Sequence, residues 1–217
     1  MTEKKIPTVE QLNDFRQQVK TAVTSSDCDK LNAFIAEYDI YTKVFEENGK
    51  MGVKDAAGQV LVPAEFDEVG YTFMDHFKPH AVPVLKDGKF ALVAQDGMGT
   101  MLSDLEYDQI HYTPECCYIL VKDGKKGLAM SDGTVVIPAQ MDQVYTPFNG
   151  LASFEKDGKS GFSMVYEGIT TEAVYDDCEL EGDTYLEVVK DGMKGFIDSN
   201  GVFTTDEDEA HFGAFCD

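Results

Sequence analysis

The sequence predicts a mainly β repeat protein that begins with a short helical hairpin. Two observations carry the prediction. An Asn-Gly or Asp-Gly pair recurs between alternating apolar residues, and a second glycine turn follows each pair nine or ten residues later. Helical periodicity is confined to the beginning of the chain. We expect a helical cap over residues 1–39, five β repeats over residues 40–205 and an acidic tail over residues 206–217.

The cap is expected to contain two helices. Thr8 is a candidate N-cap, and Thr8 and Gln11 have the spacing of a capping box. Two apolar stripes follow on either side of a Ser25-Ser26-Asp27 break; they are Val9, Leu12, Phe15 and Val19, then Leu31, Phe34, Ile35 and Tyr38. Repeat arrays need their terminal apolar faces covered, so we expect the hairpin to cap one end of the array. Docking of a partner on the two helices is the alternative.

Each repeat is predicted to be a three-stranded meander. The first turns are Asn48-Gly49, Asp87-Gly88, Asp123-Gly124, Asp157-Gly158 and Asp191-Gly192, and a type I′ hairpin turn needs positive φ at both central residues. The residue four places before each turn glycine is apolar: Phe45, Val84, Leu120, Phe154 and Val188. The first strand should therefore turn one face inward. A small residue stands three places after each turn glycine: Gly52, Ala91, Gly127, Gly161 and Gly195.

An aromatic residue or Met followed by Asp ends the first four repeats, at Phe66-Asp67, Tyr107-Asp108, Met141-Asp142 and Tyr175-Asp176. We expect each Asp to be a turn residue that bonds its own backbone, because calcium would need several convergent oxygens at each site. Five such units fit either a closed propeller-like ring or an open β array, and the sequence does not separate the two.

The repeat resembles the unit of the bacterial WG-repeat (KWG-repeat) family. The resemblance is carried by residues 123–144, which begin Asp-Gly-Lys-Lys-Gly and continue through Val-Val-Ile-Pro to Met-Asp-Gln-Val, and by residues 192–201. It implies an all-β interaction module without catalytic residues. The tryptophan of the family unit is absent from every copy; its place is held by Met51, Phe90, Lys126, Ser160 and Lys194. Any ligand surface that depends on that tryptophan is therefore not expected here.

Known reaction motifs are missing from the sequence, which has no Walker loop, dinucleotide fingerprint, zinc-protease helix or nucleophile elbow. His76 and His80 have metal-ligand spacing, but Pro79 between them disfavours the helix that would align them. Cys116 and Cys117 lie near His111 without an orienting third group, so we expect buried strand cysteines. We therefore expect no enzyme activity, no catalytic residues, no metal and no cofactor.

The charge pattern bears on the partner and the compartment. The chain has 18 basic and 40 acidic side chains, a formal charge of −22, which disfavours nucleic-acid and anionic-membrane binding. No targeting segment and no apolar run long enough to span a bilayer is visible. We expect a cytoplasmic protein with a basic protein partner, and the sequence does not predict an oligomeric state.

Two candidate partner-binding surfaces follow from this pattern. The first is the tail, where acidic residues precede two aromatic anchors: Asp206, Glu207, Asp208, Glu209, Phe212 and Phe215. The second is a basic rim formed by lysines beside the hairpin turns, represented by Lys89, Lys125 and Lys159. Our first hypothesis is that the protein is an immunity protein or antitoxin, which binds and neutralises a basic enzyme such as a toxin. The alternative is a general repeat scaffold that binds other proteins or a small ligand.

Overall fold

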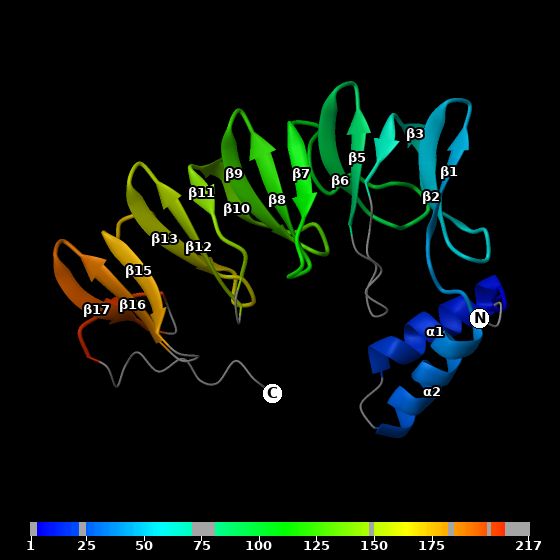
Figure 1. The fold of residues 1–217 in the computed structure, drawn as a ribbon, viewed down its shortest axis with the longest axis horizontal. Coiled ribbons are helices and arrows are strands. Elements are labelled where there is room, and N and C mark those ends of the chain that lie inside the picture. Colours follow the sequence, from blue (N-terminus) through cyan, green and yellow to red (C-terminus); the bar gives the residue numbers. More distant parts are fainter. Residues whose placement is uncertain are drawn as a thin grey trace. The chain divides into compact units, whose positions relative to one another are not determined.

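The computed structural model describes residues 4–21, 25–70, 81–147, 150–181, 185–198 and 201–206. The chain divides into two compact units, residues 1–106 and 107–217, and each is a structure of its own. The described residues contain two helices and eighteen strands (Figure 1). The predicted mainly β architecture with N-terminal helices is therefore confirmed.

The helical hairpin consists of α1 (Val9–Thr21) and α2 (Ser25–Glu37). Its predicted capping box is present, because the N–H of Gln11 donates to Thr8 Oγ1 at 3.2 Å and the N–H of Thr8 donates to Gln11 Oε1 at 2.9 Å. Leu12, Phe15 and Leu31 are buried together with Ile40, as the two apolar stripes predict.

The hairpin contacts the first sheet through the turn that follows β2. Ala57 of this turn packs against the helical cluster. Arg16, the single arginine of the chain, lies with its guanidinium 3.4 Å from the Asp55 carboxylate. The Asp55 side chain is 1% exposed and also accepts the N–H of Gln59. The cap is thus held at this turn by one charged pair as well as by apolar contacts.

Unit 1 contains two three-stranded antiparallel sheets. The first has the order β1 (Lys43–Glu47), β2 (Lys50–Lys54) and β3 (Val60–Phe66). The second has the order β4 (Glu68–Val69), β5 (Val82–Lys86) and β6 (Lys89–Val93). Buried residues of both sheets, among them Val62, Phe66, Val82 and Val93, form one core between them.

Unit 2 contains three four-stranded antiparallel sheets. One is β7 (Gln109–Tyr112), β8 (Cys117–Lys122), β9 (Lys125–Met130) and β10 (Val135–Met141). The next is β11 (Gln143–Val144), β12 (Leu151–Lys156), β13 (Lys159–Met164) and β14 (Ile169–Thr170). The last is β15 (Asp177–Glu181), β16 (Tyr185–Lys190), β17 (Met193–Ile197) and β18 (Phe203–Thr204). Apolar cores lie between successive sheets.

Four of the five sheets contain a strand that the predicted meanders lack. β4, β7, β11 and β15 each pair with the first strand of the hairpin that follows them in the chain. β4 and β11 are two-residue strands, too short to show a period in the sequence. Each of the first four repeats therefore contributes a strand to the next sheet, and the chain crosses between sheets at the aromatic-Asp or Met-Asp pair.

The predicted hairpin turns and inward faces are present. Asp123 and Gly124 have φ values of 51° and 75°, and the equivalent pairs in the other four turns share these positive values. Val84, Leu120, Phe154 and Val188 are buried, as the inward row predicts. Phe45 is only half-buried, so the first copy is the exception.

The glycine after the turn is required by a close backbone crossing in the first, third and fifth copies, at Gly52, Gly127 and Gly195. A Cβ built at Gly127 would lie 2.6 Å from both the Ile137 carbonyl oxygen and the Ala139 nitrogen of β10. Ala91 holds this place in the second copy, where the following segment is not a regular strand; it forms an isolated bridge between Val93 and Met101, and the Leu102 N–H donates to the Leu92 carbonyl at 2.8 Å. A methyl group at this position is thus accommodated where no regular third strand crosses it. Whether the repeats form a closed ring or an open array stays a prediction.

Candidate interaction surface

Four equivalent aspartates lie where the chain passes from one sheet to the next; we call Asp67, Asp108, Asp142 and Asp176 the joint aspartates. Each donates its own N–H to the following hairpin, to the carbonyls of Leu85, Val121, Glu155 and Val189 at 2.8, 2.7, 2.8 and 2.6 Å. These bonds begin the pairing of the additional strand with the hairpin. The aspartates are thus part of the connection between successive repeats.

The carboxylates of the joint aspartates bind the next hairpin turn. Asp67, Asp108 and Asp142 accept the N–H of Asp87, Asp123 and Asp157 at 3.0, 2.7 and 2.8 Å. Asp176 accepts the N–H of Gly192 at 3.1 Å. The expectation that each Asp bonds its own local backbone is therefore wrong. The tight I′ turn leaves an N–H directed outward, and the incoming carboxylate satisfies it.

A lysine of the preceding hairpin completes three of these joints. Lys50 Nζ donates to Asp67 at 2.5 Å, and Lys125 and Lys159 pair in the same way with Asp142 and Asp176. Lys89 and Asp108 hold the equivalent places in the second copy. Met193 replaces the lysine in the fifth copy, where no joint aspartate follows. Lysine and joint aspartate thus occur together along the chain.

The joint shifts the ionisation of both partners. The hydrogen bond from Lys125 holds the pKa of Asp142 below its usual value, and the N–H of Asp157 adds to the effect. The same contacts lower the pKa values of Asp67 and Asp176. The hydrogen bonds that Lys50, Lys125 and Lys159 donate to these carboxylates raise the pKa values of the three lysines. All six groups are therefore charged at neutral pH.

The pairing changes the interpretation of the predicted basic rim. A Lys-Asp-Gly-Lys turn such as residues 122–125 carries one net positive charge, and the joint aspartate bound to it carries one negative charge. The turn edges of the sheets are therefore close to neutral. Lys125 and Lys159 are each in an ion pair with the joint aspartate that ends their own repeat, and a direct role of Lys89, Lys125 and Lys159 in partner binding stays a prediction.

Unit 2 carries most of the excess negative charge. It has seven lysines against twenty-two acidic residues, a formal charge of −15, compared with −7 for unit 1. Lys125, Lys159 and Lys194 of unit 2 are in ion pairs with carboxylates. By net charge, unit 2 is therefore the more strongly anionic of the two units.

Several residues that were considered as site candidates lie outside the described residues. These are Glu207, Asp208, Glu209, Phe212 and Phe215 of the tail, and also His76 and His80. Asp206 is described; it is exposed and its N–H donates to Thr204 Oγ1 at 3.0 Å. Among the described residues, no three His, Cys, Asp or Glu side chains gather as a metal ion would require.

The two adjacent cysteines have different environments. Cys117 is buried in β8 beside Thr113, and burial raises the pKa of its thiol. Cys116 lies in the preceding turn with a φ of 58° and is only half-buried. The expectation of buried strand cysteines is confirmed for Cys117 and wrong for Cys116. The His111 ring contacts the Gln109 amide at 2.9 Å.

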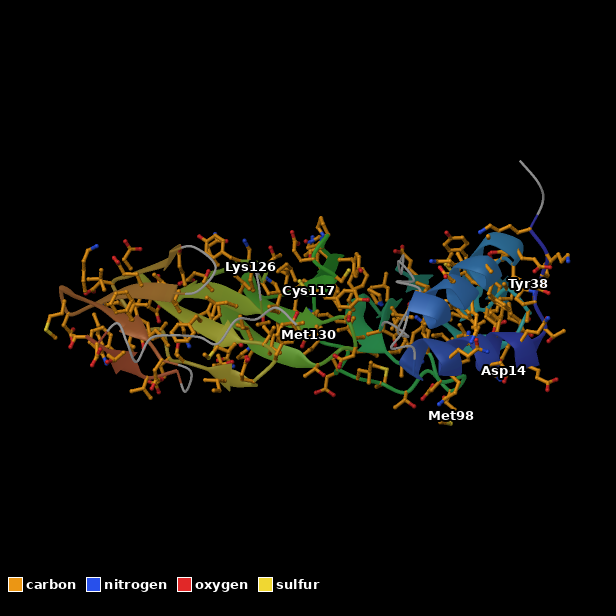
Figure 2. The ribbon with its side chains drawn as sticks, turned by 90° about the horizontal axis from the view of Figure 1, so that it is seen from below. Asp14, Tyr38, Met98, Cys117, Lys126 and Met130 are labelled. Atoms are coloured by element: carbon orange, nitrogen blue, oxygen red, sulfur yellow. The ribbon has the colours of Figure 1, made fainter. Side chains whose placement is uncertain are left out.

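An exposed apolar segment in unit 1 was not predicted. Met98, Met101, Leu102 and Leu105 are all exposed in the irregular stretch after β6. The Met98 side chain is 76% exposed and extends away from the ribbon (Figure 2). The absence of regular alternation in this copy is the sequence signal that distinguishes it from the other third strands.

The fold and its joints define a β-repeat protein of successive small antiparallel sheets. Residues 131–159 match the family model described as WG containing repeat. This match confirms the resemblance predicted from the sequence, and it supports a β-repeat protein-interaction module. No curated protein matches the chain. No helix among the described residues is both long and apolar enough to cross a membrane.

Two solved structures show a weak overall similarity. One is described as the crystal structure of the eukaryotic initiation factor, with 11% identity and a TM-score of 0.37 over 75% of this chain and 50% of the other. The other is Hsv2p of Kluyveromyces lactis, with 11% identity and a TM-score of 0.34 over 80% of this chain and 61% of the other. This chain thus matches half to three fifths of the length of these proteins.

Proposed function

We propose that the protein is a cytoplasmic, non-enzymatic interaction module that binds and neutralises a basic partner enzyme, as an immunity protein or antitoxin does. The observation that carries the proposal is the charge of unit 2, −15, with three of its lysines already in ion pairs. The WG-repeat match supports the broader class of interaction module.

The physical basis is electrostatic steering. A surface with strong excess negative charge attracts a cationic protein over distances comparable to the Debye length and raises the association rate. Charge complementarity also discriminates against anionic partners. The tail adds five acidic side chains, four of them consecutive at residues 206–209, and two aromatic side chains follow those four. The acidic side chains would attract a cationic partner, and the aromatic side chains would anchor it by apolar contact.

The test is affinity capture with the full chain in about 0.3 M salt, where the Debye length is about 6 Å and loose ionic binding is screened. We expect one stoichiometric basic enzyme whose activity falls when the purified protein is added. Neutralising the tail, with Asp206→Asn, Glu207→Gln, Asp208→Asn and Glu209→Gln together, should slow association and weaken inhibition.

The matched control neutralises four exposed glutamates elsewhere: Glu65→Gln, Glu68→Gln, Glu115→Gln and Glu167→Gln. It makes the same change in net charge and should weaken inhibition less than the tail variant. Equal effects would show that only total charge matters and would remove the tail from the site. Capture of several different proteins without inhibition would support the general scaffold instead.

A further inference from the structure

The first strand of each later hairpin is covered on its outer edge by a strand from the preceding repeat. β5, β8, β12 and β16 are paired with β4, β7, β11 and β15. At each of these edges a carbonyl accepts the N–H of a joint aspartate, for example Glu155 from Asp142 at 2.8 Å. The outer edge of the first hairpin strand therefore binds an extended segment in the same way in all four of these repeats.

β1 holds the same place in the first repeat, but its outer edge is unpaired among the described residues. It is the terminal strand of the order β1, β2, β3. Phe45 pairs with Gly52 as Phe154 pairs with Gly161, so Val44 and Glu46 correspond to Ser153 and Glu155. Ser153 and Glu155 are the residues whose carbonyls accept bonds from the added segment, from Tyr145 and Asp142. Val44 is 54% exposed.

The charge at this edge is reversed relative to the other four. The register Gln143 to Glu155 places Asp142 opposite Lys156. Lys86, Lys122 and Lys190 stand at the corresponding place in the other hairpins. In β1 this place is held by Glu47, which is exposed and follows a second exposed glutamate, Glu46. An aspartate opposite Glu47 would be repelled, whereas a cation would be attracted.

We propose that the outer edge of β1 binds an extended segment of another protein that adds as an antiparallel strand and carries Lys or Arg opposite Glu47. Backbone hydrogen bonds to Val44 and Glu46 provide the affinity, and the charge opposite Glu47 provides the selectivity. This inference goes beyond the proposed function, because the site lies in unit 1 and requires neither the tail nor an inhibited enzyme.

The experiment uses two synthetic peptides and the full chain. One peptide copies residues 139–146, Ala-Gln-Met-Asp-Gln-Val-Tyr-Thr, which contain the joint between β10 and β11. The other carries Asp142→Lys. At low salt we expect the lysine peptide to bind about tenfold more tightly and to shift the backbone amide signals of residues 43–48. N-methylation of the lysine peptide at position 142 removes the N–H that would donate to the Glu46 carbonyl, and this change should abolish binding.

Glu47→Lys is expected to reverse the preference, so that the aspartate peptide binds about tenfold more tightly. Glu47→Gln should bind both peptides alike, and Glu65→Lys, an equal charge change at an exposed residue of β3, should leave the preference unchanged. The tail-neutralised variant should also bind as the unmodified chain does, which separates this site from the proposed function.

Three results would overturn the proposal. The first is equal binding of the two peptides, or of neither, by the unmodified chain. The second is an unchanged preference after Glu47→Lys. The third is slow hydrogen exchange of the Val44 and Glu46 amides in the protein alone, which would mean that a second copy or the chain's own tail already covers the edge.

Discussion

The joint aspartate links two repeats with three contacts from one short side chain and its own backbone. Asp142 donates its N–H to Glu155 and accepts from Asp157 and from Lys125. Glu155 and Asp157 lie in the next repeat, and Lys125 lies in the repeat that Asp142 ends. An isosteric amide would keep the acceptor for Asp157 but lose the charge that attracts Lys125.

We therefore predict that Asp142→Asn lowers the urea midpoint and that Asp142→Ala lowers it further, because alanine also leaves the Asp157 N–H without its acceptor. The pKa of Asp142 is lowered in the folded protein, so its stabilising contribution is present above the ordinary carboxyl pKa of 3.8 and is lost as pH falls toward the lower folded value. The difference in urea midpoint between the native chain and Asp142→Asn should therefore disappear in acid. Glu167→Gln is the exposed control, and a gap that persists in acid would contradict the assignment.

Gly127, the small residue after the third hairpin turn, contributes to stability through steric fit rather than through charge. Gly127→Ala places a methyl group 2.6 Å from two backbone atoms of β10, so we predict a loss of about 2 to 3 kcal/mol in the free energy of unfolding. Ala91→Gly is the matched reverse change and should cost only about 1 kcal/mol. Chemical denaturation measures both. Equal losses would show that the crossing of β10 can relax.

At the scale of elements, the helical hairpin and the first sheet are joined by a partly buried charge pair. Arg16 keeps 34% of its side chain exposed, whereas Asp55 is buried. Removing the arginine leaves a buried carboxylate without its charged partner, with the N–H of Gln59 still donating to it. The attachment of the cap should therefore be sensitive to this single residue.

We predict that Arg16→Met destabilises the chain by about 1 to 3 kcal/mol and speeds hydrogen exchange in α1 and α2 before the sheets. The effect should shrink in an Asp55→Asn background, where no charge is left unpaired. Lys43→Met, which breaks the exposed pair with Asp39, is the control and should cost no more than about 0.5 kcal/mol. A full effect in the Asp55→Asn background would mean that Arg16 acts through packing alone.

How far the sequence predicts this molecule depends on the range of each interaction. The hairpin turns, the capping box and the inward rows were predictable because each depends on residues a few positions apart. The additional strand and the joint were not, because Asp67 and Asp108 bind turns 20 and 15 residues further on. One signal was present: lysine follows the turn glycine in the four copies that have a joint aspartate, and Met193 stands there in the fifth.

At the scale of the whole molecule, self-repulsion and the exposed ion pairs respond to salt in opposite ways. The charge of −22 destabilises the folded chain, and added ions screen it. The joint pairs are exposed and also weaken in salt, but exposed pairs contribute little. We predict that raising NaCl from about 20 mM to about 0.5 M at pH 7 raises the melting temperature by several degrees, because about 1 kcal/mol corresponds to about 2 to 4 °C for a chain of this size.

The control is the same salt series at pH 4.3, close to the isoelectric point of the sequence. The net charge is then small, while the joint aspartates, with their lowered pKa values, stay largely ionised. The stabilising effect of salt should therefore disappear or reverse. A melting temperature that falls with salt at pH 7 would show instead that the ion pairs outweigh the repulsion, and the joints would then be the dominant electrostatic feature of the fold.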